Sequence, residues 1–224
     1  MIHKLIKNLT NVIYSISSHI RNTTYWGSFF VGWGGAKMSP KIKYKVNSEK
    51  AIETILFLST LKKGIDLYHI AKIIFYAEKD HINKYARPII GDKYICGKDG
   101  PFPSKIRDLV HGREPYLNLD DLQAIHKTIS ISKNDDKEFP HINPLREPDM
   151  DFFSESDIEC LLGAFKKYGN LSFSELRELT HHELSYYKSV KDKEIDYLLL
   201  VDEENINRNN ILKEMSETAE YAVL

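Results

Sequence analysis

Apolar residues recur at the three-to-four-residue spacing of helices through much of the chain. One stripe runs through residues 51–58 and follows Asn47 and Ser48, either of which can cap a helix start. A second stripe runs through residues 70–77, after Asp66, another capping residue. The pattern predicts two helices, the second reaching about Tyr85, packed against each other as an antiparallel pair.

Short β-favouring runs follow these helices. Residues 87–97 place such runs around Gly91 and the aspartate after it, which predicts a small two-stranded hairpin. The Gly-Pro-Phe-Pro sequence of residues 100–103 is typical of a rigid turn. Pro103 suits the first turn of a short helix that ends at His111 and the glycine after it.

The chain then continues in extended and turn-like segments. Residues 124–132 favour a second strand, and the polar run at residues 133–137 favours a turn. Three prolines between residues 138 and 150 predict an extended segment or a loop.

Three capping boxes mark the C-terminal third, each a Ser or Thr followed three residues later by an acid. The pairs are Ser154 with Asp157, Ser172 with Glu175, and Thr180 with Glu183. The predicted helices cover about residues 155–168, 173–179, 181–190 and 207–222. Together these patterns predict a mainly α protein with a small antiparallel β element (α+β), folded as a compact single helical domain.

Composition places the chain among ordinary globular proteins. Of its 224 residues 42% are apolar and 28% are charged, which argues against a disordered, fibrous or membrane-embedded chain. The 31 basic and 32 acidic residues nearly cancel, so no global positive field exists to hold nucleic acid. Cys96 and Cys160 form no paired motif, which argues against a disulfide framework and favours a reducing cytoplasm.

Residues 1–37 differ from the rest in charge, since they hold four basic residues and no acid. They also contain both tryptophans and lead directly into Met38. We hypothesise that Met38 is the true start, because the codons of two nearby glycines can spell a ribosome-binding sequence. The alternatives are a basic amphipathic helix over residues 2–20 on a membrane surface, or an interaction arm. Residues 38–224 are expected to form the folded domain.

The sequence lacks the patterns of catalysis and cofactor binding, so we predict neither an enzyme nor a cofactor. It contains no phosphate-binding loop, no G-x-S-x-G elbow and no H-E-x-x-H pair. The neighbours His181, His182 and Glu183 point about 100° apart on a helix, which favours capping over metal binding. A buried, inert Cys96 is favoured over a reactive one, although neighbouring lysines could lower its pKa.

Five short motifs follow one another along the chain. They are IAKIIFYA at residues 70–77, YARPIIGDKY at 85–94, GP at 100–101, FSESD at 153–157 and YGNLSFSELRELTH at 168–181. In this order they resemble the Panacea domain, also called the SocA-like antitoxin domain, which is related to phage-associated GepA-like proteins. The resemblance covers about residues 45–190. Beyond the last motif the family commonly has a tryptophan where this chain has Tyr186 and Tyr187.

The motif and capping residues expected to shape such a domain come from both halves of the match. They are Gly91, Gly100, Pro101, Ser154, Asp157, Thr180, His181 and Glu183.

The resemblance implies an antitoxin of a two-gene toxin–antitoxin system, which binds a protein toxin encoded next to it and blocks it. It also implies an alternative, an adaptor that delivers the toxin to a protease. A further alternative is an autoregulator that binds operator DNA, since residues 155–168 and 173–179 have the spacing of a helix-turn-helix. Two acids against one base on the second helix argue against phosphate contact. We expect no membrane partner and no small-molecule substrate.

Tyrosine and arginine, which are enriched at interface hot spots, supply most of the candidate partner-binding residues. The candidates are Arg87, Tyr94, Phe102, Arg107, Tyr186 and Tyr187. Rigid Pro88, Pro101 and Pro103 would limit the entropy lost on binding, which favours a face around residues 87–103. The alternative is that the rings belong to the core.

Overall fold

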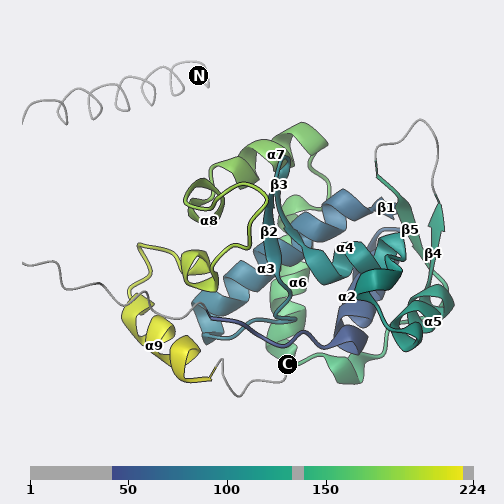
Figure 1. Ribbon diagram of the computed structural model, residues 1–224, viewed down its shortest axis with the longest axis horizontal. Coiled ribbons are helices and arrows are strands. Elements are labelled where there is room, and N and C mark those ends of the chain that lie inside the picture. The colour runs from purple at the N-terminus through teal and green to yellow at the C-terminus, as the bar shows by residue number, and fades with distance from the viewer. Residues whose placement is uncertain (1–41, 133–138, 219–224) are drawn as a thin grey trace, which may run out of the picture. The chain divides into compact units, whose positions relative to one another are not determined.

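Helix α3 (Leu67–Tyr85) is buried along most of its length, and other elements pack around it (Figure 1). The structure is a computed structural model that describes residues 42–132 and 139–218. The hypothesised start at Met38 and the turn predicted at residues 133–137 lie outside the described residues.

The described residues form eight α-helices and five short strands. The helices are α2 (Ser48–Leu61), α3, α4 (Ser104–His111), α5 (Leu119–Thr128), α6 (Glu155–Tyr168), α7 (Phe173–His181), α8 (Leu184–Tyr187) and α9 (Arg208–Thr218). The strands are β1 (Ile65–Asp66), β2 (Tyr94–Gly97), β3 (Gly100–Pro103), β4 (Ile129–Ser132) and β5 (His141–Pro144). Three 3₁₀ turns cover Glu114–Tyr116, Met150–Phe152 and Tyr197–Leu200. The predicted mainly α fold with a small antiparallel β element is confirmed.

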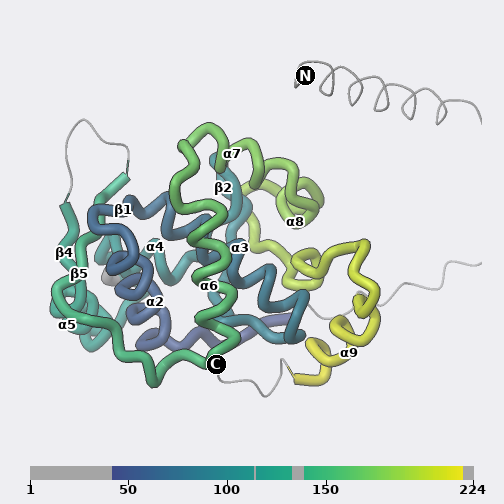
Figure 2. Tube along the Cα trace, turned by 180° about the vertical axis from the view of Figure 1, so that it is seen from behind, coloured from purple at the N-terminus to yellow at the C-terminus, as the bar shows by residue number. Residues whose placement is uncertain are grey.

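Both N-terminal helices begin at the predicted caps, but each has other main partners than expected. The side chains of Asn47 and Asp66 accept hydrogen bonds from N–H groups of the first turns of α2 and α3. Helix α3 packs most extensively on α6, whereas α2 packs on α4, α5 and β5 (Figure 2). Because α2 is buried without interruption from Lys50 to Ser59, it meets neighbours on several sides, and direct α2–α3 pairing is not its main contact.

Strands β1, β5 and β4 form one antiparallel sheet in that order. Ile142 of β5 pairs with Ile65 on one side and Ile131 on the other, so the segment predicted as extended supplies the central strand. The strand predicted over residues 124–132 is wrong in its first half, which belongs to α5. Asn118 accepts a hydrogen bond from the first turn of α5 and starts the helix, and the β-branched run takes over only at Ile129.

Strands β2 and β3 form a separate hairpin, in which Tyr94 pairs with Pro103 and Gly97 with Gly100. The hairpin predicted around Gly91, with residues 100–103 as a turn, is therefore displaced along the sequence. The outer edge of β2 is also paired, since the N–H of Cys96 donates to the carbonyl of Lys193 at 2.9 Å. The hairpin thus carries a short third segment from near the C-terminus.

The buried carboxylate of Glu78 on α3 explains why the chain does not turn back at Gly91. Its two oxygens accept hydrogen bonds from the backbone N–H groups of Ile89, Ile90 and Gly91 at 2.8, 3.1 and 2.8 Å. Gly91 has φ of 71°, a conformation that favours glycine. These bonds hold residues 89–91 against α3, so they cannot pair as a hairpin.

Two of the three predicted capping boxes are present. Ser154 with Asp157 begins α6, and Ser172 with Glu175 begins α7. The third is absent, because α7 continues through Thr180, whose hydroxyl donates to carbonyl groups of the preceding turn. The helix predicted over residues 181–190 is consequently reduced to the four residues of α8.

Replacement of Ser172 by alanine should lower the free energy of unfolding by about 1 kcal/mol, because α7 would lose the acceptor for the N–H of Glu175. Ser174→Ala is the matched control, since Ser174 is exposed two residues further along and caps nothing. Urea unfolding followed by circular dichroism measures both. Equal stability of the two variants would contradict the role of the cap.

Candidate interaction surface at the β2–β3 hairpin

The turn between β2 and β3, Lys98 and Asp99, lies where α3 and α7 meet the hairpin (Figure 1). Several polar and aromatic side chains gather around this turn from separate elements. We define the hairpin-tip face as Lys98, Asp99, Arg177, His181 and Tyr186.

On the α7 side, the face is held by contacts that fix its side chains. The Nε of Arg177 donates to Asp99 Oδ1 at 3.0 Å. The ring of Tyr186 stacks on that of His181 with centroids 4.4 Å apart, and its hydroxyl donates to the carbonyl of Lys98 at 3.5 Å. Lys98, Asp99, Arg177 and His181 border a shallow hollow, so a partner would meet a surface whose side chains are already ordered.

His181 is the residue of the hairpin-tip face whose ring is only partly hydrogen-bonded. Burial and the nearby charge of Arg177 lower its pKa although a hydrogen bond with the backbone of Lys98 opposes this, and the net effect favours the neutral ring. Its Nε2 is buried and has no hydrogen-bond partner among the described residues.

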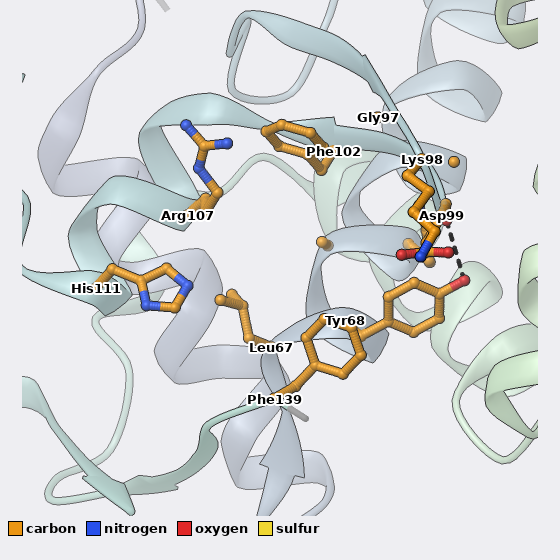
Figure 3. A pocket seen from close by; sticks show the side chains of 12 residues that line it. Leu67, Tyr68, Gly97, Lys98, Asp99, Phe102, Arg107, His111 and Phe139 are labelled. Carbon is orange, nitrogen blue, oxygen red and sulfur yellow. Dashed lines mark hydrogen bonds between the residues drawn. The ribbon is translucent and has the colours of Figure 1, made fainter. Parts of the chain in front are cut away.

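On the opposite side of the turn lies a cavity of about 170 Å³, here called the α3–α4 cavity. Its wall comes from the start of α3, the hairpin, α4 and Phe139. Figure 3 shows the side chains of Leu67, Phe102 and Arg107 around its open centre, with the guanidinium of Arg107 beside the ring of Phe102. The hydroxyl of Tyr68 donates to the carbonyl of Asp99 at 3.2 Å, which ties the hairpin turn to α3.

Lys72 lines this cavity and is only 1% exposed. Its Nζ donates to the carbonyl of Pro101 at 2.7 Å and lies 4.9 Å from the ring centre of Tyr68. Burial lowers the pKa of Lys72 to about 7, an effect that the negative charge of Asp99 offsets only in part.

Gly100 and Pro101 of β3 form the wall beside Lys72. A Cβ on Gly100 would lie 2.7 Å from Lys72 Nζ and would collide with the hydroxyl of Thr180, and Gly100 has φ of 98°. Only glycine therefore lets α3, α7 and the hairpin approach this closely. The predicted motif residues Gly100, Pro101 and Thr180 meet here.

Phe102 and Arg107 were predicted as contact residues, and the structure brings them together. The guanidinium of Arg107 lies 4.5 Å from the ring centre of Phe102, and both line the α3–α4 cavity. The neighbouring Asp108 also holds Arg107, with Nη2 to Oδ1 at 3.3 Å. The pair forms a cationic and aromatic part of the cavity wall.

Tyr94 is placed differently from the prediction. It is 1% exposed and packs in the core against Phe75 and Tyr197, so it is removed from the candidate surface. The three prolines predicted to stiffen that surface are buried as well. Tyr187 is 83% exposed at the end of α8.

Arg87 lies away from the hairpin tip, at the start of α6. Its guanidinium donates to Ser154 Oγ at 3.1 Å and contacts Asp157 at 3.4 Å. Burial raises the pKa of Asp157, but hydrogen bonds from His81 and the N–H of Ser154, with the charge of Lys50, bring it below its ordinary value. This cluster joins the end of α3 to the start of α6.

Glu183 and Cys96 have roles that differ from their sequence readings. The carboxylate of Glu183 does not cap α8 but accepts from Lys79 Nζ at 2.5 Å. Cys96 is buried as predicted, and burial together with Asp192 raises its pKa although Lys72 opposes this. Lysine neighbours therefore do not activate the thiol.

Sequence reasoning missed Lys72 and Glu78. Both belong to a helix whose apolar stripe indicates one buried face, whereas the structure buries α3 on nearly all sides. The available signal was the position of Lys72 one helical turn after Tyr68, which places the two side chains together.

Within residues 42–132 and 139–218, no group of three or more His, Cys, Asp and Glu side chains is arranged to hold a metal ion. No helix in the same residues is long and apolar enough to cross a membrane.

Comparison with known proteins identifies the family. The model of the family "Antitoxin SocA-like, Panacea domain" matches residues 70–185, just over half of the chain, which include most of α3, the β2–β3 hairpin, α6 and α7. No curated protein matches the chain. No solved structure matches it either. With its motifs and the family match in agreement, the chain belongs to the SocA-like antitoxins that carry a Panacea domain.

Proposed function

We propose that this chain is the antitoxin of a toxin–antitoxin pair and neutralises a protein toxin, encoded next to it, by direct stoichiometric binding in the cytoplasm. The observation that carries the proposal is the family match over residues 70–185. No catalytic role is needed, since occlusion of the toxin requires only a stable contact.

The hairpin-tip face is the proposed contact surface. Arginine and tyrosine at the centre of an interface commonly account for much of the binding energy. Arg177 is already held by Asp99, and Tyr186 is already stacked on His181. Binding would therefore immobilise few additional rotamers, which reduces its entropic cost.

The two alternative functions, a protease adaptor and a DNA-binding autoregulator, would each require a different kind of binding surface. An adaptor for a protease would bind the toxin and then a second protein. An autoregulator would have to place α7 on DNA, but Glu175 and Glu178 are exposed on that helix, and phosphate would repel them. Direct neutralisation is the mode that the side chains favour.

Arg177→Ala with Tyr186→Ala should weaken toxin binding by more than about 2 kcal/mol and abolish rescue of growth. The test expresses the neighbouring open reading frame in a bacterial host, with and without this chain, and measures growth, co-purification and the dissociation constant. Arg113→Ala with Tyr116→Ala is the matched control, because it removes the same two residue types from an exposed position outside the face. The control pair should leave rescue intact.

Four outcomes would count against the proposal or against its contact surface. A harmless neighbour would remove the toxin, and rescue without a complex would favour repression or adaptor-driven degradation. A specific gel shift with the operator DNA of this gene pair would support the autoregulator. Unchanged affinity in the correctly folded double variant would exclude the hairpin-tip face as the contact surface.

A further inference from the structure

The α3–α4 cavity has the size and wall of a site for one small ring. Its volume of about 170 Å³ is close to that of an engineered apolar cavity of about 150 Å³ that binds benzene. Leu67, Ala71, Phe102 and Phe139 supply apolar surface from different elements. A ring placed there would be covered by carbon on several sides.

The charges around the cavity favour an anion. Lys72, Lys98 and Arg107 line it, and the single acid in its wall, Asp99, is already paired with Arg177 at 3.0 Å. The cavity therefore has an excess of positive charge. Asp108 already pairs with Arg107, whereas Lys72 and Lys98 form no ion pair among the described residues. Flat apolar surface next to these two lysines is complementary to an aromatic ring that carries a carboxylate.

Lys72 is the group best placed to bind that carboxylate. Its ammonium is 1% exposed, and the one hydrogen-bond acceptor that it contacts among the described residues is the carbonyl of Pro101. An ammonium has three N–H donors, so donors remain for a ligand oxygen. A buried cation without an acidic partner is costly, and a bound carboxylate would relieve that cost.

We propose that the α3–α4 cavity is a binding site for a small aromatic carboxylate, with the ring between Leu67, Phe102 and Phe139 and the carboxylate on Lys72. Arg107 adds positive potential from the rim. The site is distinct from the hairpin-tip face, and the inference does not depend on toxin binding.

Calorimetry with the full chain at pH 6, where Lys72 holds its proton, tests the proposal, with phenylacetate as the probe and the uncharged phenylacetamide as its isostere. Phenylacetate should bind at least tenfold more tightly than phenylacetamide. In Lys72→Met this preference should disappear, because the carboxylate loses its buried partner. Acetate, which lacks the ring, should bind at least tenfold more weakly than phenylacetate.

A second set of variants tests the cavity without removing Lys72. Ala71→Leu should abolish phenylacetate binding by filling the space, whereas Ala164→Leu, at an equally buried alanine on α6 outside the cavity, should not. Arg107→Gln should weaken binding several-fold. Arg113→Gln, which also removes a contact with Asp108, should have no effect.

Equal binding of phenylacetate and phenylacetamide, or no binding of either at millimolar concentration, would overturn the proposal. Retained preference for phenylacetate in Lys72→Met or unchanged binding in Ala71→Leu would also overturn it. These measurements use the isolated protein, so their failure leaves the growth-rescue experiment unaffected, and failure of growth rescue leaves the binding measurements unaffected.

Discussion

Glu78→Ala should lower the free energy of unfolding by about 4–6 kcal/mol, because three backbone N–H groups would lose their acceptor inside the core. Each buried donor left without an acceptor costs about 1–3 kcal/mol. The side chain is completely buried, so water cannot replace the carboxylate without entering the core. Much of the population should be unfolded or aggregated if the protein has the ordinary stability of about 5–15 kcal/mol.

Glu78→Gln is the conservative test of the same contacts. It keeps one acceptor oxygen but turns an N–H group toward backbone donors, so its stability should lie between those of the wild type and Glu78→Ala. Asp80→Ala is the matched control on α3, since this acid is 47% exposed and pairs with Lys84 on the surface. It should change stability by less than about 0.5 kcal/mol. A loss below about 2 kcal/mol for Glu78→Ala in urea unfolding would contradict this account.

Lys72→Met should raise the free energy of unfolding by about 2–4 kcal/mol at pH 6, because it removes a charge that burial destabilises. Burial lowers the pKa of Lys72 from its ordinary value of 10.5 to about 7. Below pH 7 both the folded and the unfolded chain hold the proton, and the full cost of the buried charge is present. The lost hydrogen bond to the carbonyl of Pro101 offsets part of the gain.

The stability gain expected for Lys72→Met depends on pH. Between pH 7 and 10.5 the unfolded chain holds more protons at residue 72 than the folded chain, so the stability of the wild type rises with pH in this window. The advantage of Lys72→Met should therefore shrink by at least about 1 kcal/mol from pH 6 to pH 9. Lys84→Met, at an exposed lysine on the same helix, should show no comparable gain. A destabilised Lys72→Met, or an advantage that grows with pH, would contradict the account.

Capping residues predicted the starts of several helices correctly. The prediction was wrong where contacts between residues far apart in the sequence decide the structure. Asn47, Ser154 and Ser172 cap helices because each needs only N–H groups two or three residues away. The hairpin was misplaced because Glu78 binds N–H groups 11 to 13 residues later, a contact that no short window contains. The capping box at Thr180 failed because packing against Gly100 extends α7.

The candidate contact residues were predicted from residue type, and the structure shows which of them are exposed and which are buried. Phe102, Arg107 and Tyr186 lie near the hairpin turn, although they come from separate elements. Tyr94 lies on the same hairpin but points into the core, since alternate residues of a strand face opposite sides. Tyrosine occurs both in cores and at interfaces, so sequence alone could not separate these cases.

The pairing of the outer edge of β2 limits how far this domain can be truncated at its C-terminus. The family match ends at residue 185, yet the backbone groups of Tyr94 and Cys96 bond with residues 192–195. A chain shortened to the matched region would present this strand with open N–H and C=O groups, the kind of edge that recruits a strand from another molecule. The segment after α8 thus protects this domain from self-association, and a soluble minimal version needs to extend at least to Ile195.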